Sequence, residues 1–179
     1  MKWSQKYRKL KDTTIGVDRS TDYSVDALFH IYCEKLSDLY NRFNEMIDGS
    51  FIQSKLHKFQ ITIDHRGSFM AEKEKVDAFI LSDNENELKF IPEGTHYIGV
   101  MGKVAIKAYR KVYTFNTIRE RKLKSFKEPY LLLVQDENDK EETYWGYIKE
   151  EENAFFGHEI KRLDSKMIEK LLDEVFLSS

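Results

Sequence analysis

The chain has little of what marks disulfide-stabilised, secreted or redox proteins. Of its 179 residues, two are proline and one, Cys33, is cysteine. A single thiol cannot form an intramolecular disulfide, so the sequence predicts a reducing compartment, and we expect the protein to be cytoplasmic. Cys33 stands one helical turn from Phe29 and from Leu36. This spacing predicts a buried core residue rather than a nucleophile.

Long apolar runs and an excess of one charge are also missing. No stretch approaches the ~18 apolar residues of a membrane span, and no apolar run follows the positive charge of residues 1–5. The 29 basic and 31 acidic residues give a net charge of -2. The total charge therefore favours neither nucleic acid nor a membrane surface as partner. A length of 179 residues, 41% of them hydrophobic, predicts one domain spanning 1–179 with one core.

Motifs of the common catalytic and metal sites are absent from the sequence. The five histidines lack His-x-x-x-His spacing, and no Cys-x-x-Cys is present. Phosphate loops, Gly-x-Gly-x-x-Gly and Ser, His and Asp arrangements are missing too. The sequence therefore predicts no catalytic residue, no metal site and no cofactor.

Three segments have helical periodicity. Apolar residues at three- and four-residue spacing predict a long amphipathic helix over 24–48, with Ser24 or Asp22 as its cap and Gly49 at its end. A second helix is predicted over 105–124, although its β-branched and aromatic residues leave a strand open as the alternative. A terminal helix is predicted over 165–176. The buried stripe expected for the second helix consists of Ala105, Ala108, Tyr109, Val112, Phe115 and Ile118.

Alternating apolar and polar residues predict strands over 59–63, 76–81, 96–100, 130–134 and 144–148. A further strand over 8–17 completes the repeated order of elements described next. Asn- and Asp-rich runs at 83–86 and 136–139 predict hairpin turns. The element order strand, helix, strand, strand occurs twice, over about 5–85 and 88–150. We therefore expect an α+β fold of duplicated βαββ units. Its antiparallel sheet arrangement has two helices on one face and a central cleft, and a C-terminal helix follows at about 164–177.

Three runs, Gly67–Met70, Phe79–Asp83 and Ile91–Ile98, resemble the middle of a GyrI-like effector-binding domain of MerR-type multidrug-sensing regulators. The most specific part is Ile91-Pro92-Glu93-Gly94-Thr95, and the similarity spans about 59–150. The resemblance implies a cleft between two βαββ halves that binds amphipathic, often cationic compounds. The chain departs from the family where the last two strands carry a cleft glutamate, because leucines of 129–133 and Tyr147 or Gly146 stand there.

From the resemblance we expect a stand-alone effector-binding domain, and because the family's carboxylates are missing we expect that it is not an enzyme. We expect it to bind a small aromatic or amphipathic molecule, for transcription regulation, drug sensing or sequestration. Without the family's carboxylates, a neutral ligand fits as well as a cation. Because strand residues alternate, either Trp145 with Tyr147 or Tyr144 with Ile148 can face the cleft. The candidate ligand-binding residues are Phe69, Tyr97, Tyr109, Tyr130, Trp145 and Tyr147.

Two other functions stay open. One is a protein-protein interaction module of the gyrase-inhibitor type. The other is a degenerate hydrolase, for which Glu72, Glu74 and Glu93 are the nearest carboxylates. The basic stretch 103–127 suggests nucleic-acid binding as a function, but a solvated helix face explains the charges more simply. We therefore expect no direct nucleic-acid contact and no membrane contact.

Overall fold

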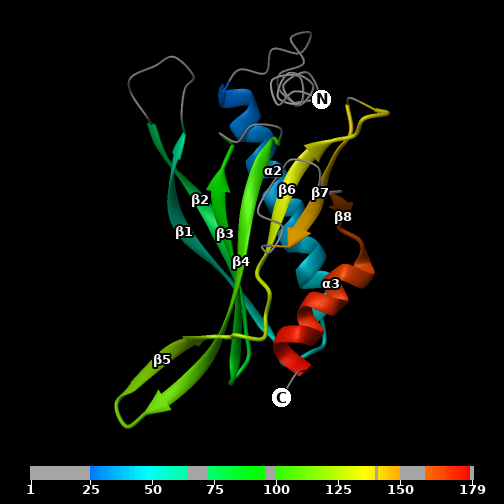
Figure 1. The fold of residues 1–179 in the computed structure, drawn as a ribbon. Coiled ribbons are helices and arrows are strands. Elements are labelled where there is room, and N and C mark those ends of the chain that lie inside the picture. Colours follow the sequence, from blue (N-terminus) through cyan, green and yellow to red (C-terminus); the bar gives the residue numbers. More distant parts are fainter. Residues whose placement is uncertain (1–24, 64–71, 96–99, 140, 150–159, 178–179) are drawn as a thin grey trace, which may run out of the picture.

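The protein is an α+β structure built on one antiparallel sheet (Figure 1). The computed structural model describes residues 25–63, 72–95, 100–139, 141–149 and 160–177. Its eight strands are ordered β1-β2-β3-β4-β6-β7-β8, with β5 paired to β4. The elements are α2 (Val25–Ile47), β1 (Gln53–Ile63), β2 (Glu72–Ser82), β3 (Asn86–Gly94), β4 (Gly102–Thr114), β5 (Thr117–Lys122), β6 (Pro129–Gln135), β7 (Thr143–Lys149), β8 (Lys161–Arg162), α3 (Ser165–Leu172) and the short π-helix η1 (Asp173–Leu177).

The long helix predicted over 24–48 is confirmed as α2. Its apolar residues recur at helical spacing, so one stripe is buried against the sheet, and Gly49 follows the helix with φ of 75°. The proposed caps Ser24 and Asp22 lie outside the described residues. The buried stripe consists of Tyr32, Leu36, Leu39, Tyr40, Phe43 and Ile47.

The face of the sheet that packs on α2, here called the inner face, forms the main core. Alternate residues of β3, β4 and β6 point into it, including Phe90, Val104 and Leu131. The predicted terminal helix is confirmed as α3, whose Ile168 and Leu171 enter the same core. Both helices therefore contribute to one core on the inner face. The opposite face is called the outer face below.

Two predicted turns are confirmed by the hydrogen bonds of their aspartates. The Asp83 carboxylate accepts from the backbone N–H of Glu85 at 2.7 Å and of Asn86 at 2.6 Å, between β2 and β3. The Asp136 carboxylate accepts from the N–H of Asn138 at 2.8 Å, between β6 and β7. In both turns the short side chain replaces a backbone acceptor, which closes a hairpin.

The predicted helix over 105–124 is wrong: this segment forms most of β4 and all of β5. Val104, Ile106 and Ala108 alternate toward the core, so the buried pattern has period two. Phe115, assigned to the buried stripe of the predicted helix, is fully exposed. Pairing of β4 with β3, β5 and β6 satisfies its backbone and overrides the local helical spacing.

This correction changes the second half of the fold. The described residues from β4 to β7 form strands only, so the expected second strand, helix, strand, strand unit has no helix there. The Ile91–Gly94 run is the end of β3, where the pairing with β4 shifts between Pro92 and Gly94. The strand predicted over 8–17, and residues 96–99 of another, lie outside the described residues.

Candidate functional site

A groove separates α2 from the hairpin of β1 and β2, and we name it the α2–β1 groove. Its volume is about 470 Å³. Apolar side chains on both walls include Leu36 and Tyr40 of α2, Leu56 of β1 and Phe79 of β2. The polar side chains of the groove are Ser37, Asn41, Asn44, Ser54, Lys55, Lys58, Lys75 and Asp77. This combination of apolar surface with a polar rim is typical of small-molecule sites.

The apolar surface of the groove is only partly covered by the helix. The Tyr40 ring stacks on the Phe79 ring with centroids 4.7 Å apart and an angle of 19° between planes. Leu56 lies directly opposite Phe79 in the strand register, yet 59% of its surface is exposed. An exposed leucine beside a buried aromatic pair offers a ligand apolar area that the fold itself leaves in water.

The polar groups of the groove carry a net positive charge. The Asp77 carboxylate forms an ion pair with the Lys58 ammonium at 2.7 Å, and the Tyr40 hydroxyl donates to the Asp77 carbonyl at 2.7 Å. Burial raises the pKa of Tyr40, so its hydroxyl remains a donor at neutral pH. Lys55 and Lys75 add two further cations to the lining. An anionic group would therefore be attracted to this groove.

Cys33 lines the same groove from α2. It is half-buried and packs at the edge of the main core, rather than inside it as predicted. Burial raises the pKa of the Cys33 thiol, and the carboxylates of Asp77 and Glu74 raise it further. The thiol is therefore protonated at neutral pH and is a weak nucleophile.

The four predicted ligand-binding residues that the structure describes do not share one cavity. Phe69 and Tyr97 lie outside the described residues. Trp145 and Tyr147 lie on the inner face of β7, opposite Leu133 and Leu131. Tyr109 and Tyr130 lie on the outer face, because their neighbours along the strands point into the core. The sheet therefore separates the four described residues into two pairs.

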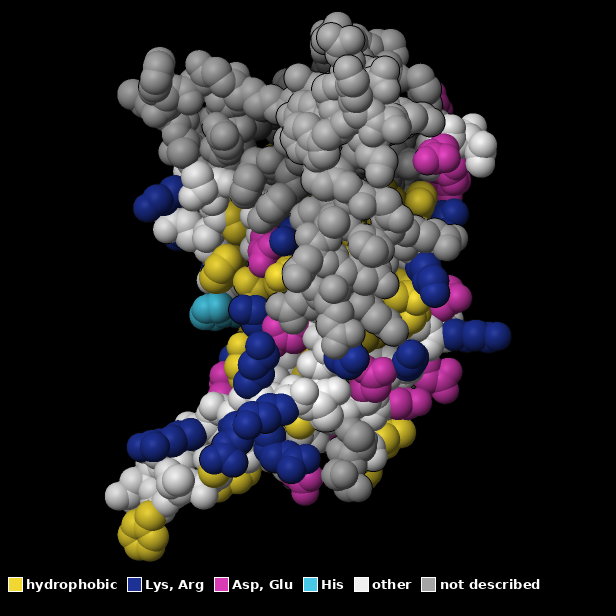
Figure 2. Space-filling model, viewed as in Figure 1, with side chains coloured by type: hydrophobic (Ala, Val, Ile, Leu, Met, Phe, Trp, Pro, Cys, Tyr) yellow, Lys and Arg dark blue, Asp and Glu magenta, His cyan; other side chains and the backbone are white. Residues whose placement is uncertain are grey.

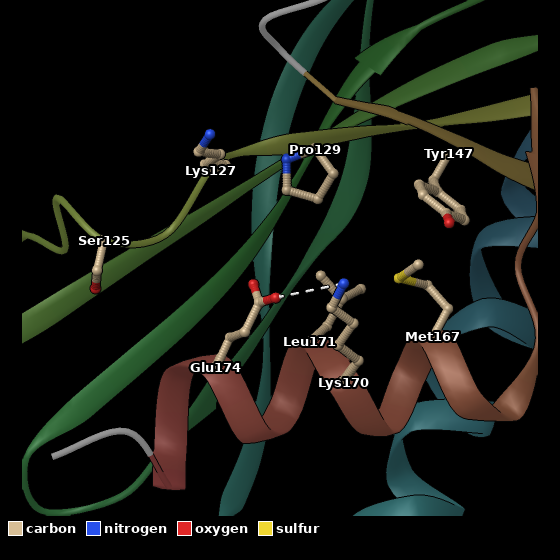
Figure 3. A pocket seen from close by; sticks show the side chains of 8 residues that line it. All are labelled: Ser125, Lys127, Pro129, Tyr147, Met167, Lys170, Leu171 and Glu174. Carbon is tan, nitrogen blue, oxygen red and sulfur yellow. Dashed lines mark ion pairs between the residues drawn. The ribbon is translucent and has the colours of Figure 1, made fainter.

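On the inner face, Trp145 is a core residue and Tyr147 lines a small pocket. The Trp145 indole N–H donates to the carbonyl of Lys35 at 2.9 Å, which ties β7 to α2. Tyr147 points toward Met167 of α3 in a pocket of about 240 Å³ (Figure 3). An ion pair between Lys170 and Glu174, 4.0 Å apart, lies on the helical side of that pocket. Its volume is below the usual range for ligand sites.

On the outer face, a lysine ammonium group of the chain itself lies over each of the two tyrosine rings. The Lys89 ammonium lies 4.9 Å from the Tyr109 ring centre, and that of Lys103 lies 3.9 Å from the Tyr130 ring centre. Glu93, one of the carboxylates considered for hydrolysis, forms an ion pair with Lys103 at 3.0 Å. Neither ring is therefore free to hold a ligand cation, and Glu93 is on the opposite face from the groove.

In the part of the chain that the structure describes, no group of three or more His, Cys, Asp and Glu residues could hold a metal ion. None of the described helices has both the length and the apolarity needed to cross a bilayer. No family model, curated protein or solved structure matches the chain. The α2–β1 groove is thus identified from its own geometry.

Sequence reasoning missed the groove because its walls are distant in the chain. Helical spacing predicts Cys33 as a core residue, and Leu56 stands alone among polar residues in 53–58. Asp77 is only one polar position in the alternating strand predicted over 76–81. The one local signal was the parity of β1, which places Leu56 and Lys58 on the same face as each other.

Proposed function

We propose that the protein is a non-catalytic binding protein that holds a small amphipathic molecule in the α2–β1 groove. The apolar body of the ligand lies on the exposed side chain of Leu56, and an anionic group faces the lysines. The observation that carries the proposal is Leu56, which is exposed although it lies directly opposite the buried Phe79. A ligand covering it would remove apolar surface from water at no cost to the fold.

The dimensions and charge of the groove support this class of ligand. A volume of about 470 Å³ lies within the range of ~300–1,000 Å³ typical of small-molecule sites. Asp77 is already paired with Lys58, so it offers little to a cation, whereas Lys75 supplies a positive charge. We therefore favour an aromatic or aliphatic anion over the cationic compounds of the GyrI-like family.

The resemblance of the Ile91–Thr95 run to GyrI-like effector-binding domains also supports effector binding, and with it a role in sensing or sequestration. The proposed position differs from the cleft which that resemblance implies. Both walls of the groove come from residues 33–79, within the first half of the chain. Ligand binding in this groove therefore does not depend on a duplicated second half.

The proposal is tested with a thermal-shift panel of matched naphthalene compounds: a carboxylate, a neutral amide and a methylamine. A ligand that binds the folded state raises the melting temperature. We expect the largest rise with the carboxylate and the smallest with the amine. Leu56→Ser and Lys75→Glu should each reduce the rise for the carboxylate.

Two matched variants control for general effects of polarity and charge. Leu177→Ser replaces another exposed leucine, and Lys166→Glu reverses another exposed lysine, both in the C-terminal helical region. We expect both controls to keep the wild-type response to the carboxylate. Equal loss in the controls, or a cooperatively melting protein that responds to none of the three compounds, would contradict the proposal.

A second candidate, the protein-protein interaction module, is favoured by the edge of the sheet. β1 pairs through 11 residues with β2 and has no other strand partner in the described part of the chain. An edge of this length can accept a strand from a partner. Hydrogen exchange distinguishes the two candidates, because an added strand would slow exchange of the outward-facing amides along β1. A ligand in the groove would mainly protect residues that line it.

A further inference from the structure

The hairpin of β4 and β5, residues 109–122, projects from the body of the protein, and we name it the hairpin arm (Figure 1). β3 ends its pairing with β4 at Arg110, so the rest of β4 pairs only with β5. The four residues from Lys111 to Thr114 extend this two-stranded ribbon by about 13 Å beyond the last residue paired with β3. The Thr114 hydroxyl donates to the Thr117 carbonyl at 2.9 Å, which holds the turn at Phe115 and Asn116.

Positive charge is concentrated on and beside the arm. Residues 107–127 contain eight Lys and Arg side chains and one acidic residue, Glu120, although the whole chain has a net charge of -2. Figure 2 shows Lys and Arg side chains gathered over β4 and β5. The remainder of the molecule is therefore acidic, and the arm with the residues beside it is a local basic surface that a partner can contact.

Three arginines share one face of the ribbon. Arg110 lies directly opposite Arg121, and Arg119 lies opposite Val112 between them and the turn. Like charges placed directly across two strands destabilise a ribbon. All three arginines are exposed, and none has an ion pair with another described residue. The fold thus gains nothing from this arrangement, which is complementary to a polyanion.

The other face of the ribbon is fixed to the body. The Tyr113 hydroxyl donates to the Asn84 carbonyl at 2.6 Å, and the Lys111 ammonium donates to the Asp83 carbonyl at 2.8 Å. Glu120 accepts from Lys89 of β3 at 2.8 Å. These contacts hold the arm in one orientation with its arginine face free, so little ordering is needed when a partner binds.

The tip of the arm is apolar. Phe115 is fully exposed and Ile118 is 63% exposed, at the end of a basic ribbon. Exposed apolar side chains on a basic arm can contact thymine methyl groups in the major groove of a duplex. They also suit a membrane interface, where cations meet lipid phosphates. The use of arginine at all three free positions favours nucleic acid, because the guanidinium bonds phosphate and guanine through two parallel N–H groups.

We propose that the hairpin arm binds double-stranded DNA. A two-stranded ribbon fits the major groove, which is about 12 Å wide and about 8.5 Å deep. Arg110, Arg119 and Arg121 contact phosphates along the groove, and Phe115 at the tip contacts thymine methyl groups on the groove floor. The sequence alone predicts no nucleic-acid contact, because the helix expected over 105–124 places these basic residues on a solvated face. Strand pairing instead brings the three guanidinium groups onto one face.

Fluorescence anisotropy with a labelled DNA duplex of about two helical turns tests the proposal across roughly 50 to 200 mM salt. The test variant is Arg110→Gln, Arg119→Gln and Arg121→Gln in one chain. We expect at least a roughly tenfold loss of affinity, and a decrease of about 3 in the slope of log affinity against log salt. The melting temperature of this variant should be equal to or higher than that of the wild type, because the repulsion between the opposed arginines Arg110 and Arg121 is removed.

A charge-matched control separates the arm from total charge. Lys73→Gln, Lys161→Gln and Lys166→Gln together remove the same charge from exposed positions outside the arm. This control should keep most of the wild-type affinity. A further variant, Phe115→Ala, should weaken DNA binding without changing the salt slope, since a phenyl ring releases no counterion.

Three results would overturn the proposal. The arginine variant could bind the duplex as tightly as wild type, or the lysine control could lose as much affinity. The third is a protein that binds no duplex but binds phosphatidylglycerol vesicles, with the binding abolished by Phe115→Ala. That outcome would assign the arm to a membrane surface instead.

Discussion

The helix α2 meets the sheet in two different ways along its inner face. Over β4 the contact is closed: Tyr32 is fully buried, and its ring packs where Gly102 has no side chain. The Tyr32 hydroxyl donates to the Lys103 carbonyl at 2.6 Å and accepts from the Gly94 N–H at 3.4 Å. Over β1 the contact is open, and Leu56 remains exposed beside the α2–β1 groove.

The difference shows which residues serve the fold and which are left for a partner. At the closed contact, both the aromatic ring and the hydroxyl of Tyr32 have partners within the chain, so these contacts stabilise the fold and leave no group for a ligand. At the open contact, Leu56 and Lys75 face solvent although neither the core nor an ion pair with a described residue needs them there. Substitutions at the closed contact should therefore reduce stability, whereas substitutions at the open contact should reduce ligand binding and leave stability nearly unchanged.

The largest expected effect is at the closed contact. In Gly102→Ala, the added methyl group would collide with the Tyr32 ring, which is trapped between helix and sheet. We expect a loss of about 2 to 3 kcal/mol in the free energy of unfolding, as for other overpacked cores. Urea denaturation measures it, with the exposed Ser125→Ala as control. Wild-type stability of Gly102→Ala would show that α2 is not seated on β4.

Loss of the Tyr32 hydroxyl sharpens the same comparison. In Tyr32→Phe, the Lys103 carbonyl loses a buried donor, so we expect about 1 to 2 kcal/mol of destabilisation. Tyr113→Phe is the matched control, because its hydroxyl also donates to a backbone carbonyl but at an exposed site. The control should lose less than about 0.5 kcal/mol. Equal losses by urea denaturation would mean that the buried hydrogen bond of Tyr32 stabilises the fold no more than an exposed one does.

Cys33 reports on the open contact through its reactivity with pH. Because burial and nearby carboxylates raise the pKa of its thiol, alkylation by iodoacetamide at pH 8 should be several-fold slower than for a free cysteine. The rate should continue to rise above ~8.5, the ordinary thiol pKa, and Asp77→Asn should accelerate it. In urea the chain should react as a free thiol. If Cys33 of the folded protein reacted as fast as a free cysteine, its half-buried position on α2 would be contradicted.

The raised pKa of Cys33 also makes the free energy of unfolding depend on pH. The folded state holds the Cys33 proton more tightly than the unfolded chain does, because the folded pKa is raised. This contribution is complete below the unfolded pKa of the thiol and is lost as the pH rises through the folded pKa. Cys33→Ser should therefore flatten the decline of stability above about pH 9.

The smallest expected effect is in the hairpin arm. Arg110→Gln removes one of two opposed guanidinium groups, so the free energy of unfolding should rise by a few tenths of a kcal/mol. The exposed Lys124→Gln, outside both strands, is the control and should leave stability unchanged. A loss of stability in Arg110→Gln, measured at low salt, would mean that the arginine serves the fold.

Local pattern was enough to predict much of this fold. Residues 24–48 repeat at helical spacing for six turns, and Asp83 and Asp136 carry their own turn-closing acceptors. Each of these elements is specified by contacts near in sequence. The segment 105–124 is different, because its alanine, lysine and arginine suit a helix. In the fold its first part, 105–110, pairs with β3, and its second part, 109–122, folds back on itself as the hairpin of β4 and β5. The pairing with β3, which helical spacing could not reveal, sets β4 as a strand.

The candidate site was harder to predict than the fold. The selected aromatic residues are divided by the sheet, with Trp145 in the core and Tyr130 covered by Lys103. Alternation predicts that neighbouring residues face opposite ways, but not which face meets a helix. The groove depends on how far α2 extends across β1, which is a property of packing.

The most direct test of the α2–β1 groove is amide chemical-shift mapping with 2-naphthoate, the anionic member of the naphthalene panel. The account predicts shift changes concentrated in residues 33–44, 54–58 and 75–79, which line the groove. They should be much smaller in Leu56→Ser and unchanged in Leu177→Ser. Changes confined to the pocket beside α3 or to the hairpin arm, or no changes at saturating compound, would contradict it.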